Sequence, residues 1–145
     1  MVRITLILLF FFSCSISYSQ TEINWLTLKD VSFIDKWSDE VDAYYYFPTF
    51  GPSVKDLEGK EVVIRGYVLP IDPENNFYIL SQNPFASCFF CGSAGPESII
   101  ELGLKNKKDK FDMDQVVTMK GILRLNKEDI YHCNYILDKA EVVKK

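Results

Sequence analysis

Residues 115–125 carry the most regular pattern in the chain, an alternation of side chains between two faces. A period of two residues is typical of a β-strand, because successive side chains of a strand point to opposite sides. Gly121 lies in the middle of this segment, and a glycine there marks a bend or the close approach of another backbone. The pattern predicts a bent strand with one face made of Val117, Met119, Gly121, Leu123 and Leu125.

Four further segments have the composition of strands, and one of them, 61–69, also contains a central glycine, Gly66. Five short strands, two of them with a glycine where a barrel turns a corner, predict a mainly-β fold. We expect a small five-stranded OB-like barrel with an N-terminal wrapping arm. The alternative is an open antiparallel sheet packed on that arm. The other strands are expected at residues 77–80, 98–102 and 131–137.

Residues 20–56 form the predicted arm, with a short helix or strand within 25–37. Pro48 and Pro52 exclude a continuous helix through the aromatic stretch 44–50, because proline lacks a donor and restricts the residue before it. Large rings dominate small cores, so packing is the favoured role of these aromatic residues. The alternative is a surface platform for a binding partner.

The N-terminal segment 1–19 has the layout of a secretory signal peptide: Arg3, an apolar run, and then small or polar residues. Cleavage after Ser19 would leave Gln20 as the new N-terminus. The apolar run 4–12 is too short for a membrane span, which needs about 20 residues. A lipid anchor at Cys14 is the less favoured alternative, because the two phenylalanines before Ser13 suit a lipoprotein signal poorly.

Export to the periplasm or the medium is therefore expected. The chain is predicted to have three parts. Residues 1–19 are the predicted signal peptide, 20–56 the arm and 57–145 the barrel domain. The formal net charge of −4 argues against a nucleic-acid partner, because binding to phosphates requires a basic surface. We expect no transmembrane span, and a protein of the cell envelope is the partner to look for.

Three stretches of the sequence carry a resemblance: Trp25-Leu-Thr-Leu, Leu57-Glu-Gly-Lys-Glu-Val-Val-Ile-Arg-Gly-Tyr-Val-Leu-Pro70, and Pro84-Phe-Ala-Ser-Cys-Phe-Phe-Cys-Gly-Ser-Ala-Gly-Pro-Glu-Ser98. They resemble an exported bacterial family, the domain-of-unknown-function family numbered three thousand two hundred ninety-nine, or a Bacteroidetes sister family. The similarity covers most of residues 25–142, and it implies export and an OB-like fold without a known activity. The family's loop has a cysteine followed by histidine and prolines, whereas this chain has Cys88-Phe-Phe-Cys91-Gly92.

The pair Cys88 and Cys91 is the motif with the most specific chemistry. Two thiolates three residues apart on one turn can bind a soft metal ion such as zinc. The same two thiols can instead close a disulfide, which persists in an exported protein. Gly92 in place of a histidine argues against haem attachment. Metal binding through the turn is the favoured hypothesis, and thiol–disulfide chemistry is the alternative.

A metal site needs further ligands, and His132 is the candidate. If 131–137 is a strand, His132 and Cys133 point to opposite faces, which leaves Cys133 as a small buried hydrophobe. Glu97 could supply an oxygen ligand or begin a helix. The predicted site is therefore Cys88, Cys91 and His132, with Glu97 and Cys133 as further candidates.

Catalytic motifs are missing from the sequence, which has no Gly-x-Ser-x-Gly, phosphate-binding loop or dinucleotide fingerprint. The single histidine, His132, also excludes a histidine pair acting as acid and base. We therefore expect binding rather than enzyme activity. The hypotheses are a metal-binding domain, a thiol–disulfide protein, and a non-catalytic partner-binding domain that uses the aromatic stretch 44–50.

Overall fold

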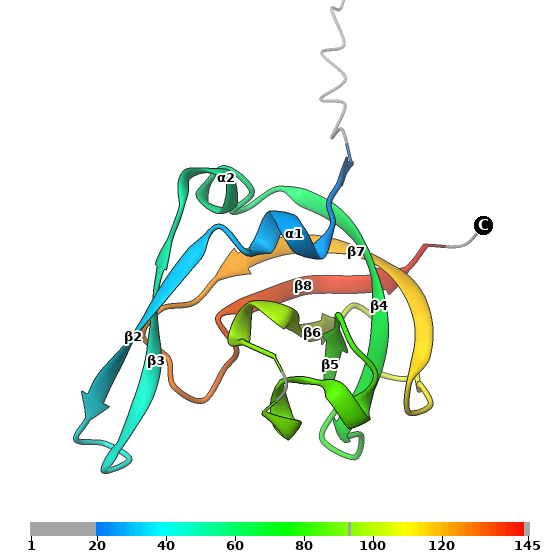
Figure 1. Ribbon diagram of the computed structural model, residues 1–145. Coiled ribbons are helices and arrows are strands. Elements are labelled where there is room, and N and C mark those ends of the chain that lie inside the picture. The colour runs from blue at the N-terminus through cyan, green and yellow to red at the C-terminus, as the bar shows by residue number, and fades with distance from the viewer. Residues whose placement is uncertain (1–19, 93, 144–145) are drawn as a thin grey trace, which may run out of the picture.

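A computed structural model describes residues 20–92 and 94–143 of the chain. The predicted signal peptide and Cys14 lie outside these residues. Short helices interrupt a chain of eight strands (Figure 1). In chain order the elements are β1 (Thr21–Glu22), α1 (Trp25–Leu28), β2 (Val31–Ser38), β3 (Ala43–Phe50), α2 (Pro52–Lys55), β4 (Glu61–Asp72), β5 (Phe77–Ser81), η1 (Phe85–Ser87), η2 (Phe89–Cys91), η3 (Pro96–Ser98), β6 (Ile99–Leu104), β7 (Gln115–Leu125) and β8 (Tyr135–Val142).

The five strands from β4 to β8 form a closed barrel. The sheet order is β1-β4-β5-β6-β8-β7, and an additional pairing of β4 with β7 joins the two sides. The predicted mainly-β, five-stranded barrel is confirmed, and the β4–β7 pairing excludes the open-sheet alternative. β1 adds a short parallel strand to β4. β2 and β3 form a separate antiparallel hairpin.

Both central glycines lie where the barrel strands approach each other closely. A Cβ at Gly66 would lie 2.6 Å from the carbonyl oxygen of Ser81 and 2.9 Å from Cζ2 of Trp25. A Cβ at Gly121 would lie 2.7 Å from the carbonyl oxygen of Asp138. The register between β7 and β8 also shifts next to Gly121, which is the signature of a bulge. The register shift agrees with the expected bend at Gly121, whereas at Gly66 the structure shows the close approach of the β5 backbone.

The last strand begins later than the sequence pattern indicates. Residues 131–134 belong to the loop between β7 and β8, and β8 runs from Tyr135 to Val142. The side chain of Asn126 holds this loop, because its Nδ2 donates to the carbonyl oxygens of Asp129 (2.7 Å), His132 and Cys133 (both 3.2 Å). The predicted strand over 131–137 is therefore wrong in its first half, so strand alternation is not what sets the directions of the His132 and Cys133 side chains.

The N-terminal arm shares one hydrophobic core with the barrel. Leu28 and Phe50 of the arm are buried in the same cluster as Tyr135. The Phe50 and Tyr135 rings meet edge to face with centroids 5.5 Å apart, and the Tyr135 hydroxyl donates to the carbonyl oxygen of Leu28 at 2.8 Å. The base of the hairpin is thus fixed to the barrel, while its far end extends away from it (Figure 1).

The aromatic stretch 44–50 is only partly core, in contrast to the favoured prediction of packing. Phe50 is buried and lies at the hairpin base, but Tyr44 and Tyr46 are 69% and 52% exposed. The reason is topological: the strand continues beyond the edge of the barrel, and Tyr44 and Tyr46 pack against Trp37 and Phe33 of the hairpin itself rather than against the barrel core.

Candidate functional site

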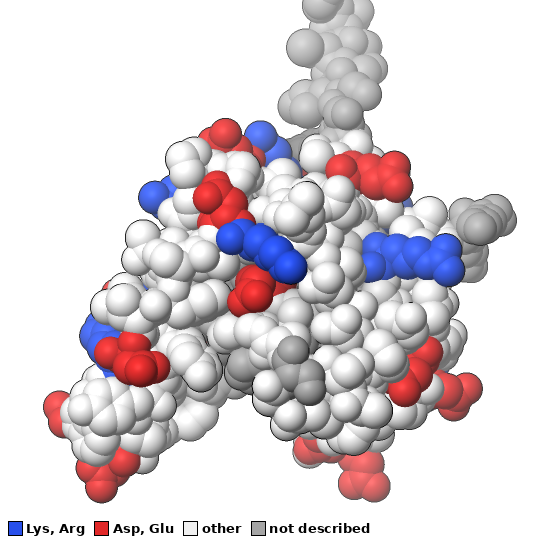
Figure 2. Space-filling view, viewed as in Figure 1, with Lys and Arg blue, Asp and Glu red and all other residues white. Residues whose placement is uncertain are grey.

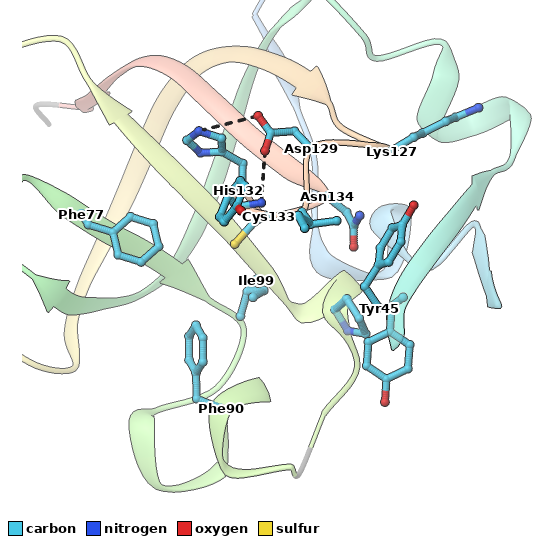
Figure 3. Close-up of a pocket in the computed structure, with 13 residues that line it drawn as sticks. Tyr45, Phe77, Phe90, Ile99, Lys127, Asp129, His132, Cys133 and Asn134 are labelled. Atoms are coloured by element: carbon cyan, nitrogen blue, oxygen red, sulfur yellow. Dashed lines mark hydrogen bonds and ion pairs between the residues drawn. The ribbon is translucent and has the colours of Figure 1, made fainter. Parts of the chain in front are cut away.

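A pocket of about 230 Å³ opens where the hairpin, the cysteine turn and the loop 126–134 meet at one end of the barrel (Figure 3). We call it the rim pocket. Phe77, Phe90 and Ile99 point toward the same space, and Lys127 points away from it. The lining residues are Tyr45, Tyr46, Phe77, Phe90, Pro96, Ile99, Lys127, Asp129, Ile130, Tyr131, His132, Cys133 and Asn134.

His132 lines this pocket with its ring held by an acidic residue from β6. Nδ1 of His132 lies 2.7 Å from Oε1 of Glu101, and Oε2 of Glu101 accepts from the backbone N–H of Cys133 at 3.1 Å. On the other side of the ring, Nε2 is 4.0 Å from a carboxylate oxygen of Asp129. Only 12% of the Glu101 side chain is exposed, so this carboxylate ties the loop to the barrel wall.

Cys88 and Cys91 lie together on one turn, and both are free thiols. Cys88 is fully buried beside Leu69 and Ile79. Cys91 is exposed, and its Sγ donates to the carbonyl oxygen of Phe85 at 3.0 Å. Desolvation of the sulfur and the neighbouring Cys88 thiol raise the pKa of Cys91 above its ordinary value. Both effects disfavour a thiolate at neutral pH.

Cys133 packs against the same apolar cluster that contains Cys88. Burial, and secondly the negative charge of Glu101, raise the pKa of Cys133 to about 12. The thiol is therefore protonated at neutral pH and poorly suited to ligate a metal or to act as a nucleophile. Its predicted role as a small buried hydrophobe agrees with this environment, although the residue lies in a loop.

The predicted metal ligands do not gather around one point. Within residues 20–92 and 94–143, no group of three or more His, Cys, Asp or Glu side chains could hold a metal ion. His132 is bound to Glu101, and Glu97 lies in the single turn of η3 with its carboxylate folded toward Gly95. Cys88 and Cys91 remain as a pair of adjacent thiols. Zinc or another soft metal at this pair stays a prediction.

The sequence interpretation missed Glu101, the residue that positions His132. The signal was present: a glutamate within the apolar run 98–102 of a predicted strand requires a partner when that strand is covered. Which partner it has depends on the pairing of β6 with β8, which brings the loop before β8 over Glu101. Local sequence does not contain that proximity.

No protein-family model and no curated protein matches the chain. A crystal structure at 2.45 Å resolution of a DUF3299 family protein from Pseudomonas aeruginosa PAO1 superposes with a TM-score of 0.53, covering 88% of this chain and 98% of that one. The chain has the fold of a DUF3299 family protein. The sequence identity is 13%, so the similarity shows the fold. It agrees with the resemblance found in the sequence.

The described part of the chain contains no helix that is both long and apolar enough to cross a bilayer.

Proposed function

We propose that this chain is an exported, non-catalytic binding domain, and that its rim pocket receives an apolar or aromatic group of the ligand. The observation that carries the proposal is that side chains from distant parts of the chain line the same cavity. Segments far apart in the sequence, β3, η2, the start of β6 and the loop 126–134, contribute side chains to one cavity. The candidate residues His132 and Cys133 line it together with Tyr45 and Tyr46 of the aromatic stretch.

The walls of the rim pocket suit such a ligand. Phe77, Phe90, Ile99 and Ile130 supply apolar surface, and polar side chains, among them Asp129, His132 and Asn134, complete the lining. Ligand sites in proteins have this composition, with apolar walls for affinity and a few polar groups for orientation. The protonated Cys133 and the Glu101-bound His132 support binding rather than nucleophilic chemistry.

Indole is a suitable probe of the pocket. In methyl NMR spectra, we expect indole to shift the Ile99 and Ile130 resonances saturably and to leave those of Ile23 unchanged. Ile130→Trp places a ring in the pocket and should weaken indole binding about tenfold or more, because the apolar contacts are already made. Val116→Trp is the control, since Val116 is exposed and lies outside the pocket. Indole binding that survives Ile130→Trp would contradict the proposal.

A second candidate function concerns Cys88 and Cys91, and their proximity favours it. Cys91 N–H donates to the carbonyl oxygen of Cys88 at 3.2 Å, so one turn holds both thiols with no third ligand among the described residues. We propose that the pair forms a disulfide in the exported protein, in which an external oxidant accepts the two electrons and two protons. Metal binding through the same pair is the alternative.

Protein purified after export separates these two chemistries. We expect one disulfide between Cys88 and Cys91, with Cys133 as the remaining thiol and no stoichiometric metal by elemental analysis. After reduction, alkylation of Cys91 should still rise above pH 9, because its pKa is raised, and Cys133, with a pKa of about 12, should stay unlabelled at neutral pH. Stoichiometric zinc or copper that is lost in Cys91→Ser but kept in Cys133→Ala would instead establish the metal site.

A further inference from the structure

One face of the β2–β3 hairpin combines exposed aromatic rings with a carboxylate. The register pairs Asp35 with Tyr46 and Trp37 with Tyr44, and residues directly opposite each other in a sheet share a face. Phe33 lies on the same face, two residues before Asp35. We call these residues, Phe33, Asp35, Trp37, Tyr44 and Tyr46, the aromatic face.

Three of the four rings of the aromatic face are exposed, Phe33 is half-buried, and the rings pack against one another in pairs. Trp37, Tyr44 and Tyr46 are 45%, 69% and 52% exposed. The Trp37 and Tyr44 rings meet edge to face at 5.1 Å, and the rings of Phe33 and Tyr46 do so at 6.2 Å. Exposed aromatic surface concentrated on a projecting element marks an interaction site rather than scattered surface residues.

Asp35 sits among these rings without a cation. Among the described residues, none is ion-paired or hydrogen-bonded to its carboxylate. The opposite face of the hairpin differs, because the Nζ of Lys36 lies 4.4 Å from the centre of the Phe47 ring. The hairpin thus supplies its own cation to one face and leaves the aromatic face without one.

The net charge of the hairpin is negative, which also favours a cationic ligand. Residues 31–50 contain four acidic side chains and one basic one, a net charge of −3 out of −4 for the whole chain. Acidic side chains cluster at the outer end of the hairpin (Figure 2). Two of these carboxylates accept hydrogen bonds from other side chains of the protein. Trp37 Nε1 donates to Asp39 at 2.9 Å, and the Tyr131 hydroxyl donates to Glu40 at 3.0 Å.

We propose that the aromatic face binds an arginine- or lysine-bearing segment of another protein. A guanidinium group stacks on aromatic rings and forms paired hydrogen bonds with a carboxylate, which is the combination that Asp35 and its neighbours offer. The inference rests on the proposed binding function in one respect: Tyr46 also lines the rim pocket, so an apolar residue next to the cation would enter that pocket.

The test uses the mature protein and the blocked peptide Gly-Arg-Leu-Arg-Gly, with its citrulline analogue as the uncharged control. We expect the arginine peptide to shift the Trp37 indole N–H resonance saturably and the citrulline peptide to bind about tenfold more weakly, because the cation–π and charge-assisted contacts are lost. Asp35→Asn should weaken binding of the arginine peptide by a similar factor.

Asp42→Asn is the matched control. It removes the same charge from the hairpin at a residue with φ 52°, a conformation that asparagine tolerates well. Its effect should stay within about twofold, because an exposed charge off the site is screened by salt. Equal weakening by Asp35→Asn and Asp42→Asn would show unspecific attraction and overturn the proposal. So would a Trp37 shift caused by dimerisation of the chain, detected by sedimentation, or by a neutral oligosaccharide instead of the peptide.

Indole binding separates this inference from the proposed function. Asp35→Asn should leave indole binding at the rim pocket unchanged. If indole binds and the arginine peptide does not, the aromatic-face proposal fails while the pocket proposal stands. If the peptide shifts Trp37 and indole does not bind, the pocket proposal fails and the cation site stands without it.

Discussion

Gly66→Ala should destabilise the barrel by about 3 kcal/mol, because the added methyl group has no free space. The added Cβ would lie 2.6 Å from the backbone carbonyl oxygen of Ser81 in β5 and 3.0 Å from Cγ of Leu80. A backbone atom within a closed barrel cannot move aside without breaking the β4–β5 ladder, in which Tyr67 pairs with Ser81. Urea unfolding monitored by circular dichroism gives the change in the free energy of unfolding.

Gly103→Ala is the control for this substitution. A Cβ at Gly103 would have as its nearest neighbour a side-chain oxygen of Asp138 at 3.2 Å, and that side chain can rotate. We expect a loss below about 1 kcal/mol. If both alanine variants lose the same stability, the close approach of β5 is not what requires glycine at position 66.

Phe50→Ala should cost about 3–5 kcal/mol, the range for removing a large buried ring. Phe50 is 1% exposed, and its ring packs against Tyr135, where the arm meets the barrel. The variant would leave a cavity and loosen the base of the hairpin. Ile34→Ala, on the same hairpin but 61% exposed, should change stability by no more than about 0.5 kcal/mol.

Thermal unfolding of Phe50→Ala also tests whether the arm and the barrel unfold together. Because Leu28, Phe50 and Tyr135 share one core, we expect a single transition at a lower temperature. A separate early transition of the arm, with the barrel transition unchanged, would contradict a shared core.

The barrel strands follow from the sequence because their information is local. The alternation over 115–125 predicts β7 with its observed bounds, since one face of the strand is in the core and the other is not. Gly66 and Gly121 are informative for a related reason, because a strand rarely contains a central glycine unless a neighbouring backbone approaches it. The segment 131–137 was misleading because its alternation does not reflect a strand over its whole length. Asn126 donates to the carbonyl oxygens of His132 and Cys133, and Asp129 accepts from the backbone N–H of Tyr131, so these three residues are held in a loop.

The candidate site depends on proximities that no local pattern contains. The sequence by itself determined the strands β4 to β7, the two glycine positions of close backbone approach and the adjacency of Cys88 and Cys91, because periodicity, backbone sterics and short spacing act within a few residues. It did not determine the β2–β3 hairpin or the start of β8. Only the tertiary structure decided that His132 meets Glu101, that Tyr46 and Phe90 face one pocket, and that Trp37 and Tyr44 stay exposed. Barrel closure brings the loop of β8 against β6, and the hairpin extends past the barrel edge, so chain topology sets which side chains meet and which remain without a partner.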